Sequence, residues 1–123
     1  RSADWWHWDG PWERNYREPY ERLRAACKEI GRPIEEITLT AQLTISLPDD
    51  PSSFEATYEH SFYPGQTFGV LGPEPADVIR EIELLVDHGV EHFTVGFDTR
   101  AELRRFIDEV VPNVRLEPQA VGR

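Results

Sequence analysis

The stretch ITLTAQLTISL, residues 37–47, alternates apolar and polar side chains along its whole length. Successive side chains of a β-strand point to opposite faces of a sheet, so this pattern predicts a strand with one apolar and one polar face. The residues from Pro48 to Ser53 are rich in turn formers and are expected to end the strand. An irregular stretch with many aromatic residues is then expected up to Gly72, and loops of this length are often functional.

Three segments around this strand repeat apolar residues every three or four positions, which is the spacing of one helix face. They cover residues 16–31, 75–89 and 99–112. Gly31 and Gly89 are placed to end the first two helices in a left-handed conformation, and Pro112 is expected to stop the third. Thr99 and Glu102 have the spacing of a capping box at the start of the third helix.

Two more strands complete the pattern. Residues 90–97 are rich in β-branched and aromatic side chains, and residues 3–8 could supply a short strand before the first helix. Strands and helices therefore alternate, which predicts parallel strands with covering helices. The expected fold class is α/β, with three strand-helix units in a single partial domain over residues 1–123. Three such units cannot close a barrel.

Composition excludes several classes of protein. The net charge of −10 would repel the phosphate backbone of a nucleic acid. No run approaches the roughly 20 apolar residues that a membrane span requires. Cys27 is the single cysteine, so no internal disulfide is possible and a cytoplasmic location is expected. Because the chain starts at Arg1 and contains no methionine, we expect it to be a piece of a longer protein.

Four short signatures occur in order along the chain. They are Ala3-Asp4 with Trp6, Gly31-Arg32-Pro33, Gly72-Pro73-Glu74 with Val78, and Asp87, Gly89 and Val90 with Phe93. Their order and spacing resemble the C-terminal part of the luciferase-like monooxygenase family. Trp5 and His7 stand where that family usually has glycine and asparagine, and Pro73 and Pro75 alter its Gly-Thr-Pro-Glu pattern. The resemblance therefore leaves the subfamily and its substrate open.

Members of that family are (β/α)8 TIM barrels that use reduced FMN or a deazaflavin coenzyme. The resemblance implies that this chain holds the last three units of such a barrel, in an oxidoreductase that acts on a small organic substrate by oxygen insertion or hydride transfer. It also implies that the first five strands, with most of the flavin contacts, lie outside the chain. The chain alone is then expected to be inactive, and to self-associate or to pair with the missing half of the barrel.

Candidate cofactor contacts come from the start of the chain, where four tryptophans lie within twelve residues. This region would lie near the carboxyl end of a barrel strand, where such folds place their active sites. The indoles could line a flavin or substrate pocket, although packing between barrel and loops is favoured. Trp6 and His7 are the cofactor candidates, and His7 could act as an acid or base or be an ordinary surface histidine.

Candidate substrate contacts are Trp8 and four polar or aromatic residues further along. If the polar face of residues 38–46 points into a barrel, Thr44 and Ser46 lie near its active end; otherwise they lie on a face wetted by solvent. His60 and Tyr63, on the following loop, could close over a ligand or be surface residues. No catalytic residue is assigned.

Two other patterns are judged structural. His88 and His92 have the spacing of a helical metal pair, but Gly89 should end the helix between them, so no metal site is expected. The glycines from 65 to 72 precede a helix, where a phosphate could bind, yet Glu74 and Asp77 place negative charge there. The alternative function is a noncatalytic α/β interaction module that uses its aromatic N-terminal region and an open sheet edge.

Overall fold

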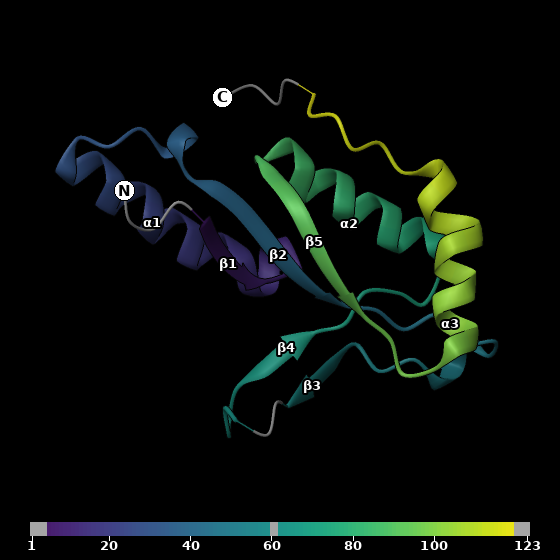
Figure 1. The fold of residues 1–123 in the computed structure, drawn as a ribbon. Coiled ribbons are helices and arrows are strands. Elements are labelled where there is room, and N and C mark those ends of the chain that lie inside the picture. Colours follow the sequence, from purple (N-terminus) through teal and green to yellow (C-terminus); the bar gives the residue numbers. More distant parts are fainter. Residues whose placement is uncertain (1–4, 60–61, 120–123) are drawn as a thin grey trace.

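The protein is described here from a computed structural model, which describes residues 5–59 and 62–119 (Figure 1). Its centre is a parallel sheet of three strands in the order β1-β2-β5. These strands are β1 (Trp5–Asp9), β2 (Thr38–Thr44) and β5 (Val90–Gly96). The expected α/β class and parallel sheet are confirmed, and the described strands do not close into a barrel.

Helices connect these strands, close to where the apolar periodicity predicts them. They are α1 (Arg17–Ile30), which follows a π-helical turn at Trp12–Tyr16; α2 (Pro75–Asp87); and α3 (Arg100–Arg105), which continues as a π-helical turn at Phe106–Val110 and a 3-10 turn at Val111–Asn113. Gly31 has φ 74° and caps α1 as expected. Pro112 does not stop the last helix. It lies at the start of the 3-10 turn, where a backbone N–H is not required.

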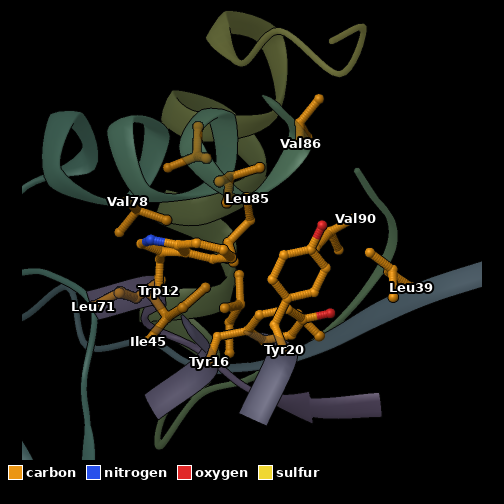
Figure 2. Close-up of a cluster of buried hydrophobic side chains, with 14 of the residues drawn as sticks. Trp12, Tyr16, Tyr20, Leu39, Ile45, Leu71, Val78, Leu85, Val86 and Val90 are labelled. Atoms are coloured by element: carbon orange, nitrogen blue, oxygen red, sulfur yellow. The ribbon is translucent and has the colours of Figure 1, made fainter. Parts of the chain in front are cut away.

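The hydrophobic core lies between the apolar face of the sheet and the two long helices. Figure 1 shows α1 and α2 behind the sheet. Leu39, Ala41, Leu43 and Ile45 of the central stretch are all buried. Trp12 fills the space between the sheet and α2, beside Val78 and Leu85, while Tyr16 and Tyr20 of the first helical segment pack next to it (Figure 2). The period-of-two pattern therefore produces the buried face that it predicts.

The opposite face of the sheet is polar. The strand registers place on it Trp5 and His7 of β1, Thr38, Thr40, Gln42 and Thr44 of β2, and His92 and Thr94 of β5. Within the described residues no helix lies on this side, which is turned toward the viewer in Figure 1. Trp5 stacks on His92 across it, with ring centroids 4.9 Å apart, and remains 62% exposed.

The segment expected to be an irregular loop, residues 48–72, contains regular structure. A 3-10 turn at Pro51–Ser53 is followed by an antiparallel hairpin of β3 (Thr57–Glu59) and β4 (Thr67–Gly69). Each strand has three residues, too few to show a period of two, so the expectation of an irregular loop was wrong. The hairpin projects from the carboxyl ends of β2 and β5 (Figure 1).

No helix in the described ranges has both the length and the apolar character needed to cross a membrane.

Glu81 of α2 joins this helix to the segment before α1. Its Oε2 accepts a hydrogen bond from the backbone N–H of Trp12 at 2.8 Å, and the side chain is half-buried. Burial raises the pKa of Glu81, and the Trp12 N–H and Arg80 oppose the rise only in part. A carboxyl group with a raised pKa in the folded state favours folding most when it is protonated. Ionised Glu81 therefore lowers the stability of the fold near neutral pH.

We expect Glu81→Gln to raise the melting temperature at pH 7, because glutamine keeps an acceptor for Trp12 N–H and removes the buried charge. The stability contributed by neutral Glu81 is fully present below the unfolded pKa, about 4.3, and is lost as pH rises through the higher folded value. The difference between variant and native chain should therefore close as pH falls toward 4.3. Thermal melts from pH 4 to pH 8 test this, and a gap that widens on acidification would contradict it.

Candidate functional site

A polar cleft lies where the central strands end. Its volume is about 370 Å³, and its lining residues place it at the carboxyl ends of β2 and β5, beside the hairpin. The lining residues are Thr44, Ile45, Ser46, Ser53, Glu55, Thr57, Tyr58, Val70 and Asp98. In parallel α/β sheets, ligands bind outside the carboxyl ends of the strands, because the loops there can vary without disturbing the core. This cleft contains Thr44 and Ser46, two of the substrate candidates.

Thr44 and Tyr58 join the sheet to the hairpin across this cleft. The Thr44 hydroxyl donates to the Tyr58 hydroxyl oxygen at 3.3 Å. Tyr58 is also in ring contact with Phe68 of the facing strand, with centroids 5.8 Å apart. The tyrosine ring is therefore held from two sides, and its hydroxyl is fixed beside the end of β2.

The hairpin is fastened to the body of the protein through β4. Asn15 Oδ1 accepts from the backbone N–H of Gly69 at 2.9 Å, and its Nδ2 donates to the carbonyl of Thr67 at 3.4 Å. Gly69 lies so close to Pro11 that a Cβ placed on it would be 2.5 Å from the proline Cδ. The wall of the cleft is thus a fixed element, although Tyr63, between its two strands, is 53% exposed.

The return of the chain from the hairpin packs against the floor of the cleft. The N–H of Ser46 donates to the carbonyl of Leu71, and the N–H of Leu71 donates to the carbonyl of Thr44, each at 2.9 Å. Ile45 and Leu71 form an isolated parallel bridge. The chain just before α2 therefore acts as a short extra strand beside the end of β2, and it leads into Gly72, which lies directly over the Ser46 carbonyl.

Glu102 ties the start of α3 to the same region. It is buried, and its Oε1 accepts from the backbone N–H of Leu47 at 2.8 Å, while Oε2 accepts from the Thr99 hydroxyl at 2.9 Å. The Glu102 N–H in turn donates to Thr99 Oγ1 at 3.1 Å. The expected capping box is therefore only half formed, because the carboxylate binds Leu47 N–H in place of the Thr99 N–H. This pairing satisfies a buried donor at the end of β2.

A capping box does occur at α2. The Glu74 side chain accepts from the backbone N–H of Asp77, and the Asp77 carboxylate accepts from the Glu74 N–H at 3.1 Å. Two free donors at the helix start are satisfied by carboxylates, which agrees with the structural interpretation of the preceding glycines.

The charged residues at the cleft are all acidic. Glu55 and Asp98 line it, and the lining contributed by residues 5–59 and 62–119 includes no lysine, arginine or histidine. Both carboxylates are exposed, and within residues 5–59 and 62–119 neither forms an ion pair. A phosphate of FMN needs donors and positive charge, so the residues present here do not fit it. Hydroxyl groups and carboxylates fit a ligand that donates hydrogen bonds.

The two cofactor candidates lie on opposite faces of β1. Trp6 points to the helix side, where its ring meets Tyr16 edge-on at 5.2 Å. His7 points to the open polar face, and its Nδ1 is 2.6 Å from Thr40 Oγ1. The Thr40 hydroxyl donates to the Trp6 carbonyl, so its oxygen accepts from His7 Nδ1–H and Nε2 is the ring nitrogen not used in this pair. The structure therefore does not bring Trp6 and His7 together.

The remaining candidates are dispersed. Trp8 lies on the helix side of β1, stacked on Trp6 with centroids 6.4 Å apart and 42% exposed. Tyr63 lies in the turn of the hairpin and contacts Phe68, and it is not among the residues that line the cleft. His60 lies outside the described residues.

The two histidines considered as a metal pair contact different tryptophans. His88 stacks on Trp12, with centroids 3.7 Å apart and planes 8° from parallel, whereas His92 stacks on Trp5. Gly89, between them, has φ 104°, so the helix ends as expected.

Sequence reasoning missed Tyr58, Glu55 and Asp98 as parts of the cleft. Asp98 follows the last strand directly, and the residue after a parallel strand is a regular position for a functional side chain, so its place could have been predicted. The hairpin carried a weaker signal. Thr57-Tyr58 and Thr67-Phe68 are β-formers on either side of Pro64-Gly65, which is a turn dipeptide.

Comparison of the chain with models of protein families, with curated proteins and with solved structures gives no match in any of the three.

Proposed function

We propose that this chain is the C-terminal part of a cytoplasmic (β/α)8-barrel oxidoreductase, similar to the luciferase-like monooxygenases, that acts on a small organic substrate with a reduced flavin or deazaflavin. The observation that carries the proposal is the order β1-β2-β5. The three strands of this sheet lie side by side in chain order, they are parallel, and the described helices of the two connections pack on one side. A doubly wound sheet would have helices on both faces, whereas a barrel wall has them on one.

The polar face supports the same proposal. A sheet face with His7, Thr40 and the stacked pair Trp5 and His92 is suited to contact other protein segments or a planar ring. In a closed barrel this face would be the interior, and the cleft at Thr44 would belong to the rim where barrel active sites lie.

The flavin would supply hydride transfer or oxygen activation when it is bound. The roles of this chain's own residues are narrower. His7, oriented by Thr40, presents Nε2 on the open face, where it could accept or hold a proton. Thr44 and Tyr58 would orient the substrate at the rim. The phosphate of FMN does not fit the cleft, so its contacts are assigned to other parts of the barrel.

The test is flavin binding by the product of the whole reading frame that encodes this chain. We expect that product to bind FMN or a deazaflavin, as measured by fluorescence titration, and the chain of residues 1–123 alone to bind far more weakly. His7→Ala should weaken binding about tenfold, equivalent to about 1.4 kcal/mol. His88→Ala, on the helix side, is the matched control and should leave the affinity unchanged. If the complete product binds neither coenzyme, the proposal is wrong.

A second candidate is the noncatalytic interaction module. It is favoured by the exposed indoles of Trp5 and Trp8 on a strand that has no further neighbour among the described residues. Sedimentation separates the candidates. A stable monomer would indicate an independent domain, whereas self-association is expected of part of a barrel.

A further inference from the structure

The geometry points to the cleft between β2 and the hairpin as a binding site for a group that donates hydrogen bonds and carries no negative charge, such as a hydroxyl-rich or amine-bearing part of an organic substrate. This inference deepens the proposed function, because it names the substrate class of the same rim. Its physical basis is the cavity and its hydroxyl groups, and both are present whether or not the chain belongs to a barrel.

Size and shape permit a small ligand. The cleft volume of about 370 Å³ lies within the range of small-molecule sites, roughly 300–1,000 Å³. Its walls come from segments far apart in sequence, namely the end of β2, the hairpin and the turn after β5. The hairpin wall is held in place by Asn15 and by the Gly69 contact with Pro11, so the site is formed before a ligand arrives.

The hydroxyl groups define what the ligand must offer. The Thr44 and Tyr58 hydroxyls bond to each other, and both oxygens keep lone pairs that can accept from a ligand in the cleft. Ser46, Ser53 and Thr57 add further hydroxyls to the lining. Since carboxylates accept hydrogen bonds and cannot donate when ionised, a ligand with several donors satisfies this lining best.

The charge of the lining decides which ligands are excluded. Glu55 and Asp98 contribute two negative charges, and among the described residues no basic side chain lines the cleft, so an anionic group would be repelled and a cationic one attracted. The net charge of −10 acts in the same direction at longer range. The expected order of affinity is cation, then neutral polyol, with anions excluded.

Three hexoses that differ in charge test this order. Glucosamine, glucose and glucuronate share a ring and its hydroxyls, and they carry a positive, a zero and a negative charge at pH 7. Each is titrated into the isotope-labelled chain while backbone amide NMR signals are followed. We expect glucosamine to shift the signals of Thr44, Ser46, Tyr58 and Asp98 most, glucose to shift them less, and glucuronate not to shift them.

Matched variants separate charge from shape. Glu55→Gln with Asp98→Asn keeps the cleft volume and removes both charges, so glucosamine should lose at least fivefold in affinity and glucuronate should bind as glucose does. Thr44→Val with Tyr58→Phe should abolish glucose binding. Glu29→Gln, on the exposed side of α1, is the control and should change nothing.

Two results would overturn the inference: glucuronate binding as tightly as glucosamine, or no shift at the cleft with any of the three sugars. Either result leaves the flavin titration of the complete product untouched. Conversely, amino-sugar binding without flavin binding would keep the cleft and reject the barrel oxidoreductase, so the two failures can be told apart.

Discussion

Replacing Gly72 with alanine is expected to lower the free energy of unfolding by about 3–5 kcal/mol, one of the largest effects available to a single methyl group in this chain. Gly72 has φ 147°, which side chains rarely adopt, and a Cβ there would lie 2.0 Å from the carbonyl oxygen of Ser46 and 3.0 Å from the Phe54 ring. The oxygen belongs to the backbone, so the overlap is relieved only if the chain before α2 moves away from the end of β2.

Gly65→Ala is the matched control. Gly65 also has a positive φ, 83°, but among the described residues no atom beyond its chain neighbours lies within 4 Å of the position that a Cβ would take. Only the backbone strain of about 1–2 kcal/mol applies there. Urea denaturation of both variants measures the difference, and amide NMR shows whether the cleft signals of Ser46 and Thr44 move. If the two substitutions lowered the free energy of unfolding equally, the overlap with the Ser46 carbonyl would make no contribution to stability.

The second large effect is expected at Trp12. Trp12→Ala should remove about 3–5 kcal/mol, because the indole is only 7% exposed and the space it leaves cannot collapse between the sheet and α2. It also removes the stacking on His88 and the contacts with Tyr16 and Tyr20 (Figure 2). Domains of ordinary stability have about 5–15 kcal/mol in total, so the variant should be close to unfolding.

Trp5→Ala provides the comparison for the same residue type. The Trp5 ring is 62% exposed and rests on His92, so its loss should change stability by no more than about 0.5 kcal/mol. Chemical denaturation monitored by circular dichroism reports both variants without depending on tryptophan fluorescence. The assignment of Trp12 to the core fails if the two substitutions cost the same.

The sequence was most informative where side-chain periodicity is long. Residues 37–47 predicted the central strand and its buried face. When one side of a sheet is buried, apolar and polar side chains alternate along the strand, and this alternation can be read directly from the sequence. The helix ends at Gly31 and Gly89 were also predicted correctly, because both residues have positive φ values, which glycine adopts readily. The parallel arrangement followed from the alternation of strands and helices.

The cleft was harder to predict, since two of its walls depend on contacts between distant segments. The hairpin strands are too short for periodicity, and the Glu102 carboxylate binds the Leu47 N–H, which is 55 residues away in the sequence. The spacing of Thr99 and Glu102 predicted that this carboxylate would accept from the Thr99 N–H in a capping box. In the structure it accepts from the Thr99 hydroxyl and from the buried Leu47 N–H. Trp6 and His7 were both predicted as cofactor contacts, although adjacent residues of a strand face opposite ways.

The side-chain amide of Asn15 imitates a peptide group. By accepting from Gly69 N–H and donating to the Thr67 carbonyl, it occupies the donor and acceptor that the outer side of β4 would otherwise offer to a foreign strand. Exposed strand edges recruit other chains into aggregates, and proteins block them in various ways. Asn15 therefore blocks intermolecular strand pairing at this edge of β4. The same region also carries exposed aromatic rings, which would favour aggregation if the edge were open.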